Sequence, residues 1–149
     1  MFEITSKSPD QITIATKNAT VTFDIAEFTI DADLKVGKLQ GPGEFEVGDA
    51  TIRGIAISQG RTIYDVEIGG IHIGIIGGFE EGLDDLGISD ILCTSSVRAI
   101  REIEPKMVVA MGNLDGMVSE LKVTARTEKK LKIKKADALP ATLEVVALS

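Results

Sequence analysis

Two side chains in this sequence carry an imidazole or a thiol, the groups that most often bind zinc or take part in nucleophilic catalysis. They are His72 and Cys93, and the sequence contains one histidine and one cysteine in all. A catalytic zinc site needs several imidazole, thiolate or carboxylate ligands and one open position for water. His72, Cys93 and neighbouring carboxylates could form such a set. We expect both residues to be structural instead, because of the elements that position them.

His72 lies in the clearest hairpin of the sequence, residues 61–76. Its turn is Gly69-Gly70, which suits the positive φ angles of a two-residue hairpin loop. This closure predicts one buried face, formed by Tyr64, Val66, Ile68, Ile71, Ile73 and Ile75. The same register places Glu67 opposite His72 on the other face. We therefore predict a surface histidine paired with a carboxylate.

Cys93 ends an apolar strand, 90–94, just before serines that can cap a helix over 96–104. A helix N-terminus can lower the pKa of a thiol, but a nucleophile also needs a base, and His72 is the only imidazole. We expect Cys93 to be a small buried hydrophobe. A further strand over 106–111 completes a βαβ unit, which predicts a parallel strand pair.

Four carboxylates cluster in residues 79–85 and could hold a hard cation. They are Glu80, Glu81, Asp84 and Asp85. Their spacing lacks the regular oxygen pattern of a calcium-binding loop. We predict a solvated acidic loop.

Basic residues concentrate near the end of a chain whose net charge is −7. Five lysines occupy the segment 129–135: Lys129, Lys130, Lys132, Lys134 and Lys135. Three of them alternate with apolar residues, which predicts a solvated edge strand protected by lysine. The alternative is a binding surface for an anionic partner. Nucleic acid is not expected, because the net charge is acidic and no aromatic residue separates the lysines.

The composition suits one domain spanning residues 1–149, with 44% hydrophobic residues. Period-two patterning dominates, and helices are expected only over 96–104 and 114–122. No run approaches the roughly 18 apolar residues that cross a bilayer, and the first residues lack a signal-peptide pattern. A single cysteine fits a reducing compartment. We expect a cytoplasmic protein without a membrane partner.

Several segments, in order, resemble a known family. They are "GPGEFEVGDATIRGI" (41–55), "TIYDVEIGGIHI", "IREIEPKMVVAM" and "KLKIKKADALP". This string is similar to the small bacterial branch of the metallo-β-lactamase-fold, zinc-dependent hydrolases. The resemblance covers residues 40–149 nearly throughout and residues 1–30 more loosely. It implies an α/β (α+β) fold, a β-sandwich flanked by few helices and truncated relative to the full αββα arrangement.

The sequence departs from this family at the metal ligands. The HxHxDH motif that should precede residue 41 is missing, and the chain runs through "DADLKVGKLQ" instead. The family's bridging aspartate aligns with Gly78, and its late histidine aligns with Gly112. The early Gly-His pair is replaced within "SKSPDQ" (6–11). The resemblance therefore implies metal-site loops without ligands, and we predict no catalytic residue, no zinc and no other cofactor.

These observations predict a non-catalytic protein that acts as an oligomeric scaffold or binding module. One alternative is a metal-dependent hydrolase with an unconventional site, or with a site completed between subunits. A weaker alternative is polyanion binding through the basic strand 129–135. Loss of the motif segment should uncover apolar sheet surface, so we expect a homo-oligomer, most simply a two-fold dimer burying on the order of 800 Å² per partner. The sequence names no protein partner.

Overall fold

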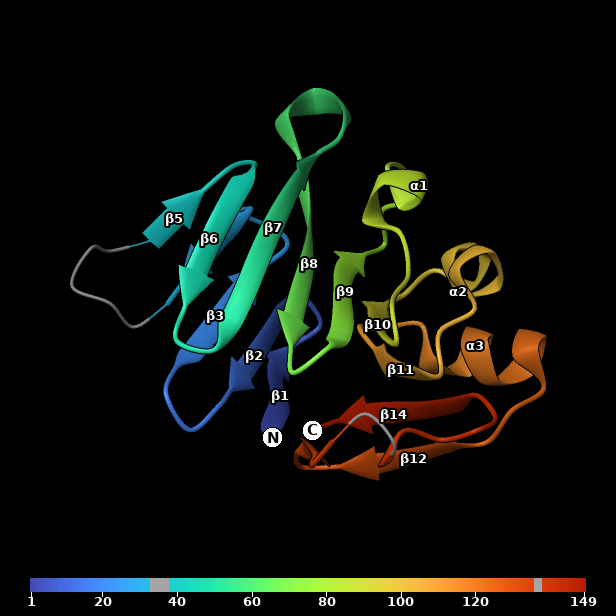
Figure 1. Cartoon of the computed structure of the whole chain (residues 1–149). Coiled ribbons are helices and arrows are strands. Elements are labelled where there is room, and N and C mark those ends of the chain that lie inside the picture. The colour runs from blue at the N-terminus through green and yellow to red at the C-terminus, as the bar shows by residue number, and fades with distance from the viewer. Residues whose placement is uncertain (33–37, 136–137) are drawn as a thin grey trace.

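The computed structural model describes residues 1–32, 38–135 and 138–149. Two β-sheets pack face to face, and helices lie on the outer face of the larger sheet (Figure 1). The smaller sheet has the strand order β13-β1-β2-β3-β4-β5, and the larger sheet has the order β12-β14-β11-β10-β9-β8-β7-β6. The expected β-rich α+β architecture is confirmed.

The smaller sheet is antiparallel throughout. Its strands are β1 (Phe2–Ser8), β2 (Gln11–Ala15), β3 (Thr20–Asp24), β4 (Thr29–Asp31), β5 (Lys38–Gln40) and β13 (Leu131–Ile133). Apolar and polar residues alternate along β1, β2 and β3, so each strand buries one face and leaves the other to water.

The larger sheet is antiparallel in one half and parallel in the other. The antiparallel half contains β6 (Gly43–Val47), β7 (Ala50–Ala56), β8 (Thr62–Ile68) and β9 (Ile71–Gly77). The strands parallel to β9 are β10 (Ile91–Thr94), β11 (Met107–Ala110), β14 (Glu144–Leu148) and β12 (Ala125–Glu128). All four residues of β10 are buried, as expected for a strand covered on both faces.

Helices cover the parallel half of the larger sheet. They are α1 (Leu83–Leu86), α2 (Val97–Ile103) and α3 (Leu114–Leu121), and a 3-10 turn, η1 (Ser58–Gly60), follows β7. Ser96 caps α2, because its Oγ accepts a hydrogen bond from the N–H of Ala99 at 3.0 Å. Apolar residues of all three helices share one buried cluster with the outward residues Leu92 and Val108 of the sheet. No described helix is long and apolar enough to span a membrane.

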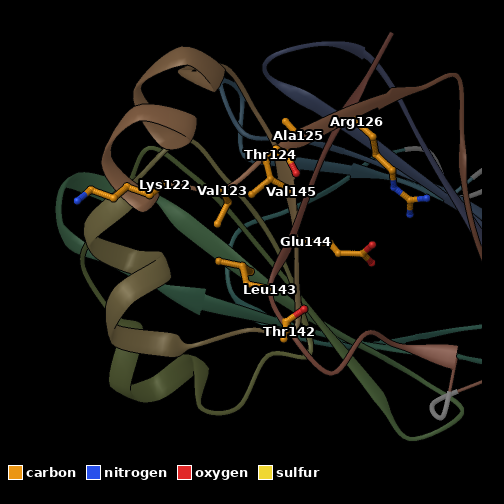
Figure 2. Close-up of a pocket in the computed structure, with 9 residues that line it drawn as sticks. All are labelled: Lys122, Val123, Thr124, Ala125, Arg126, Thr142, Leu143, Glu144 and Val145. Carbon is orange, nitrogen blue, oxygen red and sulfur yellow. The ribbon is translucent and has the colours of Figure 1, made fainter.

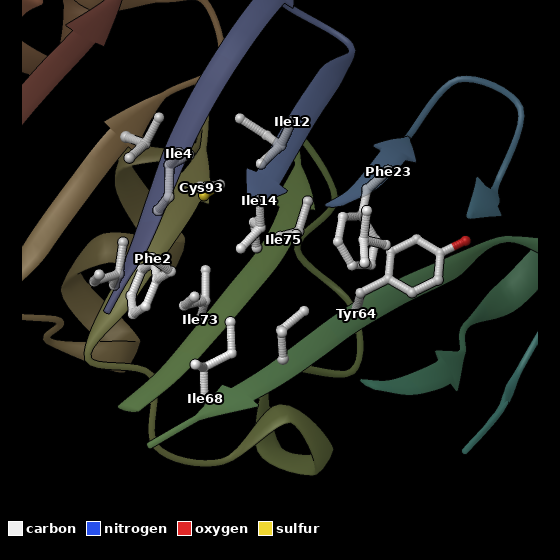
Figure 3. Packing of buried hydrophobic residues seen from close by; sticks show 14 of the residues in the cluster. Phe2, Ile4, Ile12, Ile14, Phe23, Tyr64, Ile68, Ile73, Ile75 and Cys93 are labelled. Carbon is white, nitrogen blue, oxygen red and sulfur yellow. The ribbon is translucent and has the colours of Figure 1, made fainter. Parts of the chain in front are cut away.

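The main core lies between the two sheets. Figure 3 shows Phe2, Ile4 and Phe23 of the smaller sheet facing Ile73 and Tyr64 of the larger one. The rings of Phe23 and Tyr64 lie 5.2 Å apart between centroids and are tilted by 54°. Such aromatic contacts and fully buried aliphatic side chains hold the sheets together.

The predicted hairpin and βαβ unit are confirmed. Ile68 pairs with Ile71, and Glu67 pairs with His72, as a two-residue turn requires. β10 and β11 are parallel and are joined through α2. The basic strand is shorter than predicted, because within 129–135 only Leu131–Ile133 pairs with the sheet.

The outer face of the smaller sheet is polar. Thr5, Thr13 and Thr22 stand side by side across β1, β2 and β3, and the hydroxyls of Thr13 and Thr22 lie 2.9 Å apart. Among the described residues, the exposed large hydrophobic side chains are Met1 and Ile88. The expectation of an uncovered apolar sheet surface is therefore wrong for this part of the chain. The dimer itself stays a prediction.

Candidate functional site at the carboxyl edge of the larger sheet

The parallel strands of the larger sheet all end at one edge, which we call the carboxyl edge. Ligands of parallel sheets commonly bind beyond the carboxyl ends of the strands. The loops after β9, β10 and β11 are joined there by hydrogen bonds. The N–H of Ser95 donates to Gly77 O at 2.9 Å, that of Met111 donates to Thr94 O at 2.9 Å, and Asn113 Nδ2 donates to Ser95 O at 3.0 Å.

Glycines stand where these loops leave β9 and β11. Gly77 has φ +57° and Gly112 has φ +92°, in the region that favours glycine. A Cβ at Gly77 would lie 2.8 Å from Ile25 Cγ2, and one at Gly78 would lie 3.1 Å from Ser95 Oγ. A ligating side chain at any of these positions would meet either a tight contact or an unfavourable backbone conformation.

A cleft of about 290 Å³ opens at this edge, between the β1–β2 turn and the ends of β11 and β14. Its lining residues are Ser6, Lys7, Ser8, Pro9, Ala110, Gly112, Leu114, Ala147, Leu148 and Ser149. The structure thus brings Gly112 together with the turn at residues 6–11, the two places where the resemblance leads us to expect lost metal ligands. Gly78 is not among the lining residues.

The chemistry available in this carboxyl-edge cleft is limited. Lys7 supplies the one charged side chain among the lining residues. The Ser6 hydroxyl is engaged by the turn itself, 2.7 Å from Ser8 O and 2.8 Å from Gln11 O. Such a lining can hold a small ligand, but it contains no imidazole, thiol or carboxylate side chain to act as a base or a metal ligand.

The four carboxylate residues of the predicted acidic loop are exposed, as predicted, and the two glutamates have specific partners. Glu80 accepts a hydrogen bond from Ser96 Oγ at 2.5 Å. Glu81 accepts from Ser58 Oγ at 2.7 Å and pairs with Arg61, whose guanidinium lies 4.7 Å from the centre of the Phe79 ring. The hydrogen bond from the Ser58 side chain is the main cause that lowers the pKa of Glu81.

The same segment contains α1, which the sequence did not predict. Its Leu83 and Leu86 are buried against the larger sheet, while Asp84 and Asp85 are exposed. Each of the two glutamates before it has its own partner, so the four carboxylates do not converge on one point.

His72 does pair with carboxylates, and its nearest partner is Asp65. The Nδ1 atom of His72 lies 3.2 Å from Asp65 Oδ1, whereas its Nε2 lies 3.9 Å from Glu67 Oε2. Arg53 also lies 3.6 Å from Asp65. Asp65 pairs with Gly74 in the hairpin, so the imidazole of His72 reaches Asp65 diagonally across the two strands. Burial is the main cause that raises the pKa of Asp65.

Cys93 lies in the core between the sheets (Figure 3). Its side chain is fully buried, and burial raises the pKa of the thiol. The predicted role as a small hydrophobe is confirmed, and the thiol is shielded from any substrate in solution.

The lysines of the basic segment lie along the edge strand β13. The Nζ atoms of Lys130 and Lys132 each lie 3.9 Å from Glu3 Oε1 on the neighbouring strand. Lys129, Lys134 and Lys135 are exposed. The predicted lysine-protected edge strand is confirmed for Leu131–Ile133, and its role toward an anionic partner stays a prediction.

A second hollow, about 640 Å³, lies away from the carboxyl edge, at the amino ends of β12 and β14. It is lined by residues 122–126 and 142–145. Figure 2 shows Val123 and Leu143 pointing toward the helices, while Lys122 points away from the hollow. This open hollow borders the edge of the larger sheet.

Within residues 1–32, 38–135 and 138–149, no group of three or more histidine, cysteine, aspartate or glutamate residues could hold a metal ion. Residues 31–40, where the resemblance implies that the histidine motif is missing, lie partly outside the described residues.

Comparison with known proteins gives one informative result. No family model and no curated protein matches the chain. The chain is similar in structure to a proposed zinc-dependent hydrolase of the metallo-β-lactamase superfamily from Thermotoga maritima, with 15% sequence identity and a TM-score of 0.70. The alignment covers 100% of both chains. The fold of this protein is therefore that of the metallo-β-lactamase superfamily.

Proposed function

We propose that this protein is a non-catalytic member of the metallo-β-lactamase fold that acts as an oligomeric scaffold or binding module. The observation that carries the proposal is the carboxyl edge. There Gly78 and Gly112 stand at the positions where the resembling family has metal ligands, and a glycine has no side chain that could hold a metal ion. A hydrolytic zinc site needs an activated water held by several ligands, which these loops do not supply.

The arrangement of layers supports a shortened fold. The described helices all pack on the larger sheet, whereas the four-layer αββα arrangement has helices on both outer faces. We infer that a strand–helix unit has been lost from the side of the smaller sheet. The polar outer face of that sheet fits this inference, because threonine and charged side chains can face water without a covering helix.

Native mass spectrometry of protein purified without chelator and without a histidine tag tests the proposal. We expect a chain mass without bound metal. We also expect equal melting temperatures with added Zn²⁺ and with EDTA, because a ligand that binds only the folded state would raise the melting temperature.

One or two metal ions per chain, together with a higher melting temperature in Zn²⁺, would contradict the proposal. Such a result would favour the metal-dependent hydrolase. The variants His72→Gln and Cys93→Ala, which remove the one imidazole and the one thiol, would then show whether either side chain holds the metal.

A further inference from the structure

We propose that two copies of this protein pair edge to edge through β12, around a two-fold axis at Thr127. The inference deepens the scaffold role proposed above and rests on it, since it names the surface that builds the assembly. The partner is a second copy of this chain, and the two larger sheets would join into one continuous sheet.

β12 has an open side. It is the last strand of the larger sheet and pairs with β14 within the described residues. The N–H of Ser149 donates to Glu128 O at 3.0 Å, so the backbone groups of Glu128 face β14. Backbone groups of successive residues in a strand point to opposite sides, so the N–H and C=O of Thr127 face the open edge.

This direction limits how two β12 strands can pair. An antiparallel pair centred on Thr127 lets the two threonines exchange both backbone hydrogen bonds. That register places Arg126 opposite the partner's Glu128, and Glu128 opposite the partner's Arg126. Opposite charges facing each other across two strands are stabilising, and like charges are destabilising.

The charges of β12 favour the register centred on Thr127 over registers shifted by one residue. Within one chain, Arg126 Nη1 lies 3.8 Å from Glu128 Oε1, and the two side chains are 48% and 44% exposed. Pairing at Thr127 would therefore form a ring of four alternating charges. Centring the pair on Arg126 or on Glu128 would instead set two guanidinium groups or two carboxylates against each other.

The other edge strands lack this self-complementarity. β6 presents Glu44 and Glu46, both exposed, and β13 presents Lys132 with Lys130 beside it. Pairing either strand with itself would oppose like charges. β5 has Lys38 and Gln40 and offers no ion pair.

The test is a dilution series of the full chain, followed by native mass spectrometry and sedimentation. We expect a dimer whose dissociation constant rises at least about tenfold in Arg126→Glu, because that change leaves only carboxylates along the edge. The double variant Arg126→Glu/Glu128→Arg restores alternating charges and should return the dissociation constant to near its original value.

A backbone variant tests the hydrogen bonds separately. Thr127→Pro removes the outward N–H without removing a donor to β14, and proline is tolerated on edge strands. We expect Thr127→Pro to dissociate the dimer. Thr127→Val, which keeps the N–H, and Glu46→Lys on the opposite edge should leave it intact.

A monomer throughout the dilution series would overturn the inference, as would a dimer that Arg126→Glu and Thr127→Pro leave intact or that Glu46→Lys dissociates. These outcomes are separate from those for the proposed function. A dimer through β12 that carries metal would refute the non-catalytic role and keep the interface. A metal-free monomer would keep the non-catalytic role and refute both the interface and the oligomeric scaffold.

Discussion

His72 lies closer to Asp65 than to Glu67, although Glu67 is the residue directly opposite it in the hairpin. The side chain of Asp65 is 9% exposed and also faces Arg53. Burial nevertheless dominates and raises the pKa of Asp65 above its usual value of 3.8. The charged form of this carboxylate is therefore less favourable in the folded state than in the unfolded state.

The sign of the resulting pH dependence follows from linkage. Because the pKa of Asp65 is higher in the folded state, protonation of this carboxyl group favours folding. The contribution to stability is full below pH 3.8 and is lost as the pH rises through the folded pKa. We expect the free energy of unfolding of Asp65→Asn to lack this decrease with rising pH. Urea unfolding from about pH 4 to pH 7 measures it, with the more exposed Glu67→Gln as control. An unchanged pH profile in Asp65→Asn would contradict the assignment.

The contact between Gly77 and Ile25 predicts a specific cost for an added methyl group. Gly60 also has positive φ, +72°, but a Cβ there meets nothing within 4 Å. We expect Gly60→Ala to cost about 1–2 kcal/mol from backbone strain alone. Gly77→Ala should cost about 1–3 kcal/mol more, because its Cβ would overlap Ile25. Equal free energies of unfolding for the two variants would show that the loop relaxes freely.

Full burial of Cys93 predicts an unreactive thiol. Native protein should resist iodoacetamide, and labelling should rise with urea along the unfolding transition. Cys93→Ala should cost roughly 1–2 kcal/mol through the cavity it leaves. Fast labelling of the native protein would mean that the two sheets separate locally at this strand.

Ser96 joins two parts of the carboxyl edge, since it caps α2 and donates to Glu80. We expect Ser96→Ala to destabilise the protein by about 1–2 kcal/mol, through loss of the cap and of the Glu80 contact. The neighbouring Ser95→Ala, which removes no cap, should stay within about 0.5 kcal/mol. Thermal unfolding of Ser96→Ala, Glu80→Ala and the double variant separates the two contributions.

The sequence correctly predicted those elements that a short local motif specifies. The Gly69-Gly70 turn fixes the register of the hairpin, and the serine before Val97 fixes the start of α2. The strand β12 was missed, because "ARTE" has a single apolar residue and is a strand only through its pairing with β14. α1 was missed because its two leucines are embedded among carboxylates.

The candidate site depended on contacts between distant parts of the chain. A resemblance pointed to Gly112 and to the turn at residues 6–11 separately, but their meeting at one cleft follows from the way the two sheets stack. The pairing of His72 with Asp65 is a diagonal contact across the hairpin, whereas the register alone places Glu67 opposite His72. Such features come from packing between elements and not from the pattern within one element.

The position of β14 between β11 and β12 also has a consequence for the order of folding. β12 precedes β14 along the chain, yet it reaches the sheet only through β14. During synthesis, β11 therefore remains an unpaired apolar edge, and β12 has no neighbour, until residues 144–148 have left the ribosome. The nascent chain is most exposed to mispairing and to chaperone capture at that stage, and a chain shortened before Glu144 would retain this vulnerability permanently.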